Sequence, residues 1–329
     1  MQGIELIVSV SSPMELDGTD LSPYDSVCLG NPYCRRVEGN YAEQLALLPG
    51  AVSSLREAGK KVYVTSPAAP RGRDLPHVER LVDAAGRAGA QALEVHNMGV
   101  LRILRERGNP LPAHMGAYAN VYTHLGAKVM KDYGAVRVRP NAEVSSREME
   151  IIAREAEIEV EVLAHGKIPL GVTDRCSLLT ESEEADSNCP SACRKDHWLT
   201  SREPALRGGS HPGKGERREG GWVLKTVGKG ILSGRDMCML EHLPGLLSAG
   251  FSVFRIEGLH ESAAYRSEIG RVYREALELA ASGGTYGLRP DWADTVRRHA
   301  HVGFCNGYLF GKTGKLYVGP VLQKGNPVL

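Results

Sequence analysis

The sequence predicts an α/β protein, a TIM-like (β/α)8 barrel with a cysteine-bearing insertion after its seventh strand and a short C-terminal tail. Strand-like runs rich in Val, Ile and Leu alternate with helix-like runs almost from the first residue, as in a parallel sheet built from β-α units. The unit repeats about eight times, which favours a closed barrel over an open sheet. The length of 329 residues also suits one large barrel, which takes roughly 250 residues.

Eight short apolar runs are predicted as strands. They span residues 4–10, 26–29, 61–65, 91–95, 110–114, 135–139, 158–164 and 252–256. Residues 74–89 place apolar side chains on one helical face, and three further segments are helix-like: 121–133, 145–156 and 261–281. Between a helix and the next strand, a left-handed helix end favours glycine, and five glycines stand at such places: Gly59, Gly89, Gly108, Gly134 and Gly250.

The chain is expected to form two parts. Residues 1–290 form the barrel with its insertion at 166–236, and residues 291–329 form a C-terminal extension that packs on the barrel. The middle of the insertion, residues 207–221, is too polar and glycine-rich to pack into a core. It is therefore either a contact for nucleic acid or another partner, or the solvated tip of a hairpin.

Charge and hydropathy exclude several classes of protein. There are 40 Lys and Arg residues against 39 Asp and Glu, a net charge of +1, so no strong uniform field steers the chain onto nucleic acid or an anionic membrane. The opening apolar run, residues 4–10, is short and unlike a signal peptide. No apolar stretch approaches the roughly 20 residues that span a bilayer. We expect a cytoplasmic protein with no membrane span.

The cysteines suggest a metal centre. Seven cysteines are an odd number, and without a secretion signal they do not indicate a disulfide framework. Cys176, Cys189 and Cys193 lie in the insertion with twelve and then three intervening residues, which is not the paired spacing of a zinc ribbon. Thiolates at irregular gaps suit an iron-sulfur cluster, which needs four of them.

The fourth thiolate has two candidates. Cys34 follows the second strand, so its loop opens on the C-terminal face of the barrel, where barrel active sites form. Cys238, predicted at the start of an amphipathic helix, is the rival. Otherwise Cys238 is a buried structural thiol, as we expect for Cys305, and Cys28 is expected in the core.

Five segments together resemble the collagenase-like peptidase family U32. They are EVEVLAHGKIPLGVTDRCSLL (159–179), CPSACR (189–194), GRDMCMLEHLPGLLSAG (234–250), FRIEGLHESAAYRSEIGRVYREALE (254–278) and GFCNGYLFGKTG (303–314). Most members carry a cysteine six residues before the one in the RC motif, where this chain has Leu170. In the UbiV-type branch that loss is compensated by an early cysteine, and VCLGNPYCRR (27–36) resembles its motif. By resemblance, Cys34, Cys176, Cys189 and Cys193 ligate a four-iron, four-sulfur (4Fe-4S) cluster.

The resemblance also implies a function. This branch acts in O2-independent hydroxylation of a quinone precursor, with prephenate as the oxygen donor, and pairs with a second U32 family member, a paralogue, as a heterodimer. Other branches hydroxylate bases in transfer or ribosomal RNA, so an RNA-base hydroxylase is an alternative. A noncatalytic cluster-bearing partner subunit is a third hypothesis. A peptidase is the outsider, because neither a His-Glu-x-x-His helix nor a Gly-x-Ser-x-Gly turn is present.

Eight polar residues near strand ends or family motifs are the candidate site residues. Arginines could hold an acidic oxygen donor by bidentate hydrogen bonds, with ion pairs to Glu143, Glu161 or Glu257 as the alternative. Histidines could donate protons near neutral pH, and His165 belongs to the family HG motif. The family motif IEGR reads IEGL here, with Leu259 replacing the arginine, so an altered substrate is expected. We assign catalytic roles to His165, Arg175, Glu161 and Glu257, and substrate binding to Arg139, Arg255, Asn120 and His114.

Overall fold

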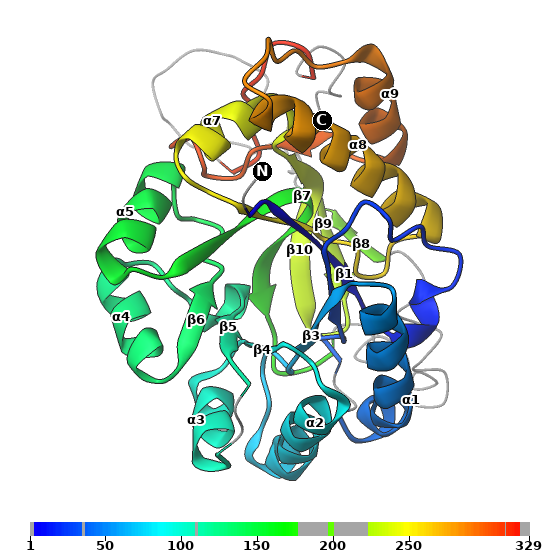
Figure 1. The fold of residues 1–329 in the computed structure, drawn as a ribbon, viewed down its shortest axis with the longest axis vertical. Helices are drawn as coiled ribbons and strands as arrows, with labels where there is room; N and C mark the ends of the chain where they lie inside the picture. Colours follow the sequence, from blue (N-terminus) through cyan, green and yellow to red (C-terminus); the bar gives the residue numbers. More distant parts are fainter. Residues whose placement is uncertain are drawn as a thin grey trace, which may run out of the picture.

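The computed structural model describes residues 3–34, 37–108, 111–176, 197–200, 223–312 and 314–322. Eight parallel strands follow one another around a ring, and the last pairs with both the seventh and the first, so the barrel is closed (Figure 1). This confirms the predicted fold. The barrel strands are β1 (Glu5–Val10), β2 (Ser26–Leu29), β3 (Lys61–Thr65), β4 (Ala92–Val95), β5 (Ala113–Met115), β6 (Ala135–Val138), β7 (Glu159–Val172) and β11 (Val253–Ile256).

Helices form the outer layer around the strands (Figure 1). They are α1 (Val37–Glu57), α2 (Leu75–Ala88), α3 (Met98–Glu106), α4 (His124–Asp132), α5 (Ser146–Ala156), α7 (Leu243–Ser248) and α8 (Ala263–Ala281). The four predicted helices correspond to α2, α4, α5 and α8. All five glycines predicted at helix ends have positive φ, between 60° and 94°. At Gly89, for example, the left-handed residue ends α2 and its N–H bonds the last turn.

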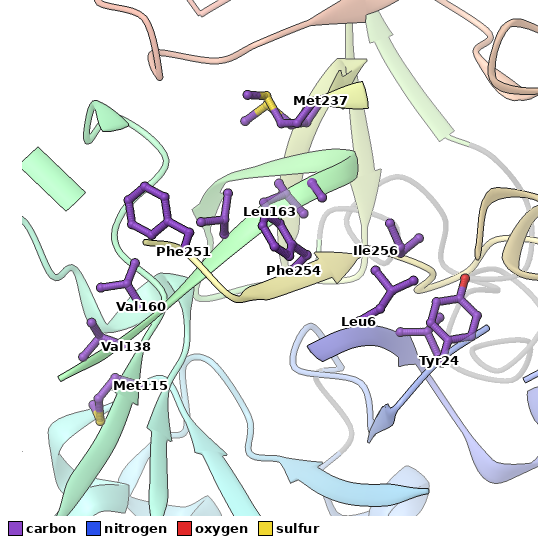
Figure 2. Packing of buried hydrophobic residues seen from close by; sticks show 14 of the residues in the cluster. Leu6, Tyr24, Met115, Val138, Val160, Leu163, Met237, Phe251, Phe254 and Ile256 are labelled. Carbon is purple, nitrogen blue, oxygen red and sulfur yellow. The ribbon is translucent and has the colours of Figure 1, made fainter. Parts of the chain in front are cut away.

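The largest apolar core lies between the outer face of the barrel and the helices. It includes Leu6 of β1, Val160 of β7 and Phe254 and Ile256 of β11, all at most 4% exposed. Figure 2 shows such side chains on neighbouring barrel strands. Burial of each side chain of this size contributes about 1.5–3 kcal/mol, which makes this layer the main source of stability.

The interior of the barrel is largely polar. At its N-terminal end, Arg137 of β6 donates to Glu5 of β1 at 2.6 Å and to Glu159 of β7 at 2.5 Å. Ser26 and Tyr63 donate hydrogen bonds to Glu5 as well. Burial alone would raise the pKa of Glu5, but Arg137 and these hydrogen bonds lower it to about 2. The charges are therefore paired across several strands of the ring.

The seventh strand departs from its predicted end at residue 164. β7 continues to Val172 because β10 (Gly230–Cys238) pairs with it antiparallel, followed by β9 (Val223–Val227) and β8 (His197–Thr200). The prediction that Cys238 begins an amphipathic helix was therefore wrong. Cys238 ends β10 opposite His165, and α7 begins only at Leu243. The apolar run around Cys238 fits both the helical and the strand period, and its pairing with β7 makes it a strand.

The C-terminal segment contacts both the barrel helices and the extended sheet. In α9 (Pro290–His299), Arg298 and His299 bind Glu268 of α8, and β12 (Phe304–Cys305) pairs with β10. The division into 1–290 and 291–329 stays a prediction. Within the described residues, no helix has both the length and the apolar character needed to cross a bilayer.

Arg137→Ala is expected to lower the free energy of unfolding by about 3–5 kcal/mol, because it leaves the buried Glu5 carboxylate with only the exposed Lys61, 3.7 Å away, as a cationic partner. Urea denaturation followed by circular dichroism measures the loss. The control is Arg154→Ala, which removes an exposed pair with Glu155 and should cost less than about 1 kcal/mol. Equal effects of the two changes would contradict a structural role for the interior pair.

Candidate functional site

Cys34 is presented by a tight turn directly after β2. The turn reads Asn31-Pro32-Tyr33-Cys34, with asparagine first and proline second, which is a favoured order for a β-turn. The Asn31 side-chain oxygen accepts a hydrogen bond from the Tyr33 N–H at 3.0 Å, and its amide nitrogen lies 3.2 Å from His260 Nε2. Cys34 is buried, at 7% exposure.

The segment that ends at Cys176 lies beside this turn. Lys229, at the tip between β9 and β10, donates its N–H to the Tyr33 carbonyl at 2.9 Å. Its own carbonyl accepts from the Thr173 N–H at 2.8 Å. The approach is so close that a Cβ at Gly228 would come within 2.5 Å of the Tyr33 oxygen. One backbone link thus joins the segments that carry Cys34 and Cys176.

Cys238 lies at the other end of the β7–β10 pair. Its register partner is His165, whereas Gly230, next to the Tyr33 contact, pairs with Val172. Seven residues of strand, at about 3.3 Å each, place the two ends on the order of 20 Å apart. Burial raises the pKa of Cys238 to about 12 and that of Cys305 to about 11, so both stay protonated thiols. Of the two candidates for the fourth thiolate, Cys34 is the one whose segment is joined to that of Cys176.

Arg255 occupies the middle of the barrel interior. It binds Glu161 through two nitrogens, donates to Glu94 at 2.5 Å and donates to Ser9 at 2.9 Å. Burial alone would lower its pKa, but the Glu161 and Glu94 carboxylates raise it well above the usual value. Arg255 and Glu161, both predicted site residues, therefore form the ion pair that was the alternative to substrate binding.

Arg139 lies above this pair, at the C-terminal end of β6. It donates to Glu257 at a long 3.4 Å, and it lies 3.8 Å from Glu94 and 3.9 Å from Glu161. Its Nε has no hydrogen-bond partner within the described residues, although the side chain is buried. The predicted alternative partner Glu143 instead accepts from Tyr122 on the surface. Arg139 and Glu257 thus form a contact that leaves hydrogen-bonding capacity unused.

Arg139 and Glu257 belong to a set of buried polar residues at the carboxyl ends of the barrel strands. Five side-chain atoms without a hydrogen-bond partner among the described residues follow the carboxyl ends of five strands: Ser66 Oγ, His96 Nδ1, the Tyr118 hydroxyl, Arg139 Nε and Glu257 Oε1. We call these residues the mouth ring. The Tyr118 hydroxyl lies near enough to Tyr33 for each to influence the other's pKa, and the two rings meet edge to face at 5.8 Å.

The two predicted histidines lie elsewhere. His165 Nδ1 is 3.2 Å from the Tyr273 hydroxyl of α8, so the imidazole lies between the barrel and the helix. His114 does not end its strand as predicted. It lies in the middle of β5, with its ring 4.6 Å from that of Tyr63, because the strand extends one residue beyond its predicted end, to Met115. Burial lowers the pKa of both imidazoles to about 3, which keeps them neutral at pH 7.

Other predicted residues lie at the surface or outside the described chain. Arg175 is exposed beside Cys176, and Asn120 is exposed with its side-chain oxygen bonded to Asn141. Cys189, Cys193 and the polar stretch 207–221 lie outside the described residues. Leu259, in place of the family arginine, packs with Tyr33.

Sequence reasoning missed part of the mouth ring. His96 directly follows a strand, and the rule that selected Arg139 applies to it equally. Glu94 could have been found as a charged residue within a buried strand. Ser66 directly follows β3, so the same rule could have found it, whereas Tyr118 lies three residues beyond β5 and carries no such signal.

A family model, described as Peptidase family U32, matches residues 24–318. The chain belongs to peptidase family U32. The U32 match therefore includes every barrel strand after β1, the turn with Cys34 and the segment with Cys176. It agrees with the resemblance seen in the sequence motifs.

Curated U32-like relatives carry different names. The tRNA hydroxylation protein P of Escherichia coli is 26% identical over 87% of this chain and 70% of its own length. An uncharacterized protease of Methanocaldococcus jannaschii is 26% identical over 78% of this chain and 60% of its length. A collagenase of Porphyromonas gingivalis is 22% identical over 78% of this chain and 61% of its length. The U32 chain thus spans about 60–70% of these relatives.

A solved U32 peptidase, Mk0906, aligns with a TM-score of 0.40 and 13% identity over 54% of this chain and 74% of its own. Since this TM-score is low, the fold assignment depends on the strand pairing of the chain itself.

The His165 resonance should show no titration between pH 8 and pH 5, because burial holds the pKa of its imidazole near 3. Two-dimensional NMR of the histidine ring measures this. In urea-unfolded protein the same ring should titrate near the ordinary value of about 6.5. Since the unfolded chain binds the proton first, His165 also makes the fold less stable as pH falls from about 6.5 toward 3. Titration near pH 6.5 in the folded protein would contradict the buried position.

Proposed function

We propose that this U32 protein is an iron-sulfur subunit of an O2-independent hydroxylase. The backbone link through Lys229 between the Cys34 and Cys176 segments is the observation that carries the proposal. The names of the tRNA hydroxylation relatives support hydroxylation as the reaction class.

The described thiols fit the expected cluster. Cys34 and Cys176 are buried in adjoining loops, and sulfur donors suit iron. Together with Cys189 and Cys193 they would hold a 4Fe-4S cluster. When bound, such a cluster supplies or accepts single electrons. The protein's own contribution is to hold these loops against the loop after β3. There Arg71 pairs with Asp174, the Ala69 carbonyl accepts from Lys229 Nζ at 3.0 Å, and the Ala68 N–H donates to the Pro32 carbonyl at 2.9 Å.

The mouth ring would bind and orient the substrate. Arg139 offers an unused N–H and Glu257 an unused carboxylate oxygen, side by side. Arg255 donates to three protein side chains, so its part is to fix Glu161 and Glu94 beneath the ring. His165 and His114 are neutral at pH 7 and would accept or donate hydrogen bonds without carrying charge.

Two molecules have specific support as the substrate that receives the hydroxyl group. Replacement of the usual family cysteine by Leu170, together with Cys34, is the pattern that favours a quinone precursor, with prephenate as oxygen donor and a U32 paralogue as partner. Leu170 itself is 49% exposed near the end of β7. The names of the relatives favour a base in transfer RNA. A strain that lacks this protein should lose the quinone if the substrate is a quinone precursor, and a hydroxylated base if the substrate is RNA.

Cys34→Ala is expected to abolish the cluster, because it removes one of four thiolate ligands. Protein purified without oxygen should contain about four irons per chain and absorb broadly in the visible range, and the variant should lose both signals. Iron analysis and absorption spectroscopy measure this. Cys238→Ala is the matched control, since that thiol is also buried but lies at the far end of β10. Loss of iron in Cys238→Ala, with iron retained in Cys34→Ala, would sink the assignment.

A deletion strain grown without oxygen should lose one hydroxylated product. Mass spectrometry of its quinones and of its RNA bases compares the two acceptors. Loss of the quinone supports the small aromatic acceptor, and loss of a hydroxylated base supports RNA. If complementation with an Arg139→Met variant restores the product, the noncatalytic partner hypothesis gains support. Unchanged quinones and bases, together with gelatin cleavage by the purified protein, would favour a peptidase.

A further inference from the structure

Five of the eight buried side-chain atoms that lack a hydrogen-bond partner among the described residues belong to the mouth ring. Each buried polar atom without a partner costs about 1–3 kcal/mol, so five in one ring are unusual for a purely structural feature. They include a donor, Arg139 Nε, and an acceptor, Glu257 Oε1, on side chains that already touch. A ligand that offers an acceptor beside a donor would satisfy both.

The charges around the ring disfavour an anion. Three carboxylates, those of Glu94, Glu161 and Glu257, outnumber the two arginines that they face, Arg139 and Arg255. Glu94 also lies 2.9 Å from His96 Nε2. Burial alone would raise the pKa of Glu94 and Glu161, but the two arginines lower both, so these carboxylates stay ionised. Two like charges 4 Å apart repel by about 4 kcal/mol at an effective dielectric constant of 20. A carboxylate ligand beside Glu257 would meet this repulsion.

Aromatic side chains border the ring. Tyr33 and Tyr118 meet edge to face, and the Tyr118 and His96 rings lie 5.7 Å apart. Such faces suit a flat ring, since aromatic pairs gain about 0.5–1.5 kcal/mol beyond their buried area. Leu259 in place of the family arginine adds an apolar contact to Tyr33 and no charge.

We propose that Arg139 and Glu257 form a specificity pair that selects an uncharged ring carrying an acceptor beside a donor, and rejects a carboxylate. The inference rests on the proposed hydroxylase function and deepens it, because both a phenolic quinone precursor and a nucleobase have this chemistry. Arg139 donates to the ligand oxygen, and Glu257 accepts from the ligand O–H or N–H. An acidic oxygen donor is then bound outside the pair.

Binding of three probes to the full chain tests this, by ligand-observed NMR at pH 7.5 under nitrogen. The probes are phenol, uridine and benzoate; phenol and uridine distinguish the two sources of the neutral ring, and benzoate adds the charge. The wild type should bind phenol or uridine at least about tenfold more tightly than benzoate, a difference of about 1.4 kcal/mol. Glu257→Gln should lower the affinity for the neutral probe and raise the affinity for benzoate, each by about tenfold or more.

Glu143→Gln is the matched control, because it removes the same charge from an exposed position in the loop after β6. This change should leave the order of the probe affinities as in the wild type. The specificity pair is overturned if benzoate binds the wild type best, if Glu257→Gln keeps the wild-type order, if Glu143→Gln shifts it equally, or if no probe binds up to about 10 mM. Iron content, measured on the same samples, reports separately on the cluster, so loss of iron with selectivity retained would contradict only the proposed function.

Discussion

The buried ion pair between Arg255 and Glu161 is the interaction on which the rest of the barrel interior depends. It joins β11 to β7, where the ring closes, and its further contacts reach Glu94 of β4 and Ser9 of β1. A charge in this position is tolerated only when it is paired and hydrogen-bonded, because the interior offers no water. The pairing therefore constrains the register of four strands and fills the centre of the barrel with fixed charges.

The incomplete hydrogen bonding of Arg139 follows from this arrangement. Arg255 has already taken the best positions on Glu161 and Glu94, so Arg139 approaches the same carboxylates only to 3.8–3.9 Å. What remains for Arg139 is one long hydrogen bond to Glu257 and an unused N–H. Arg255 thus uses its donors within the barrel, whereas Arg139 at the C-terminal end of β6 keeps one N–H for a ligand.

The loops that carry the sulfur atoms are arranged by a different part of the molecule. β10 extends the sheet beside β7, and its tip carries Lys229 to the turn after β2. The extension also separates Cys238 and Cys305 from Cys176 by the length of a strand pair. The same sheet thus holds one pair of thiol loops together and keeps two other thiols in the core, where burial leaves them protonated.

Much of the fold could be predicted because its signals are local. The strand and helix periods and the glycines at helix ends depend on neighbours within a few residues. The irregular spacing of the cysteines in the insertion is likewise a property of the chain alone. Tertiary structure decided what depends on partners far away in the sequence: that Cys238 ends a strand, that His165 faces α8, and that Arg255 is saturated while Arg139 is not. Side-chain pairing across a closed barrel follows from strand register, and register is set only when all eight strands meet.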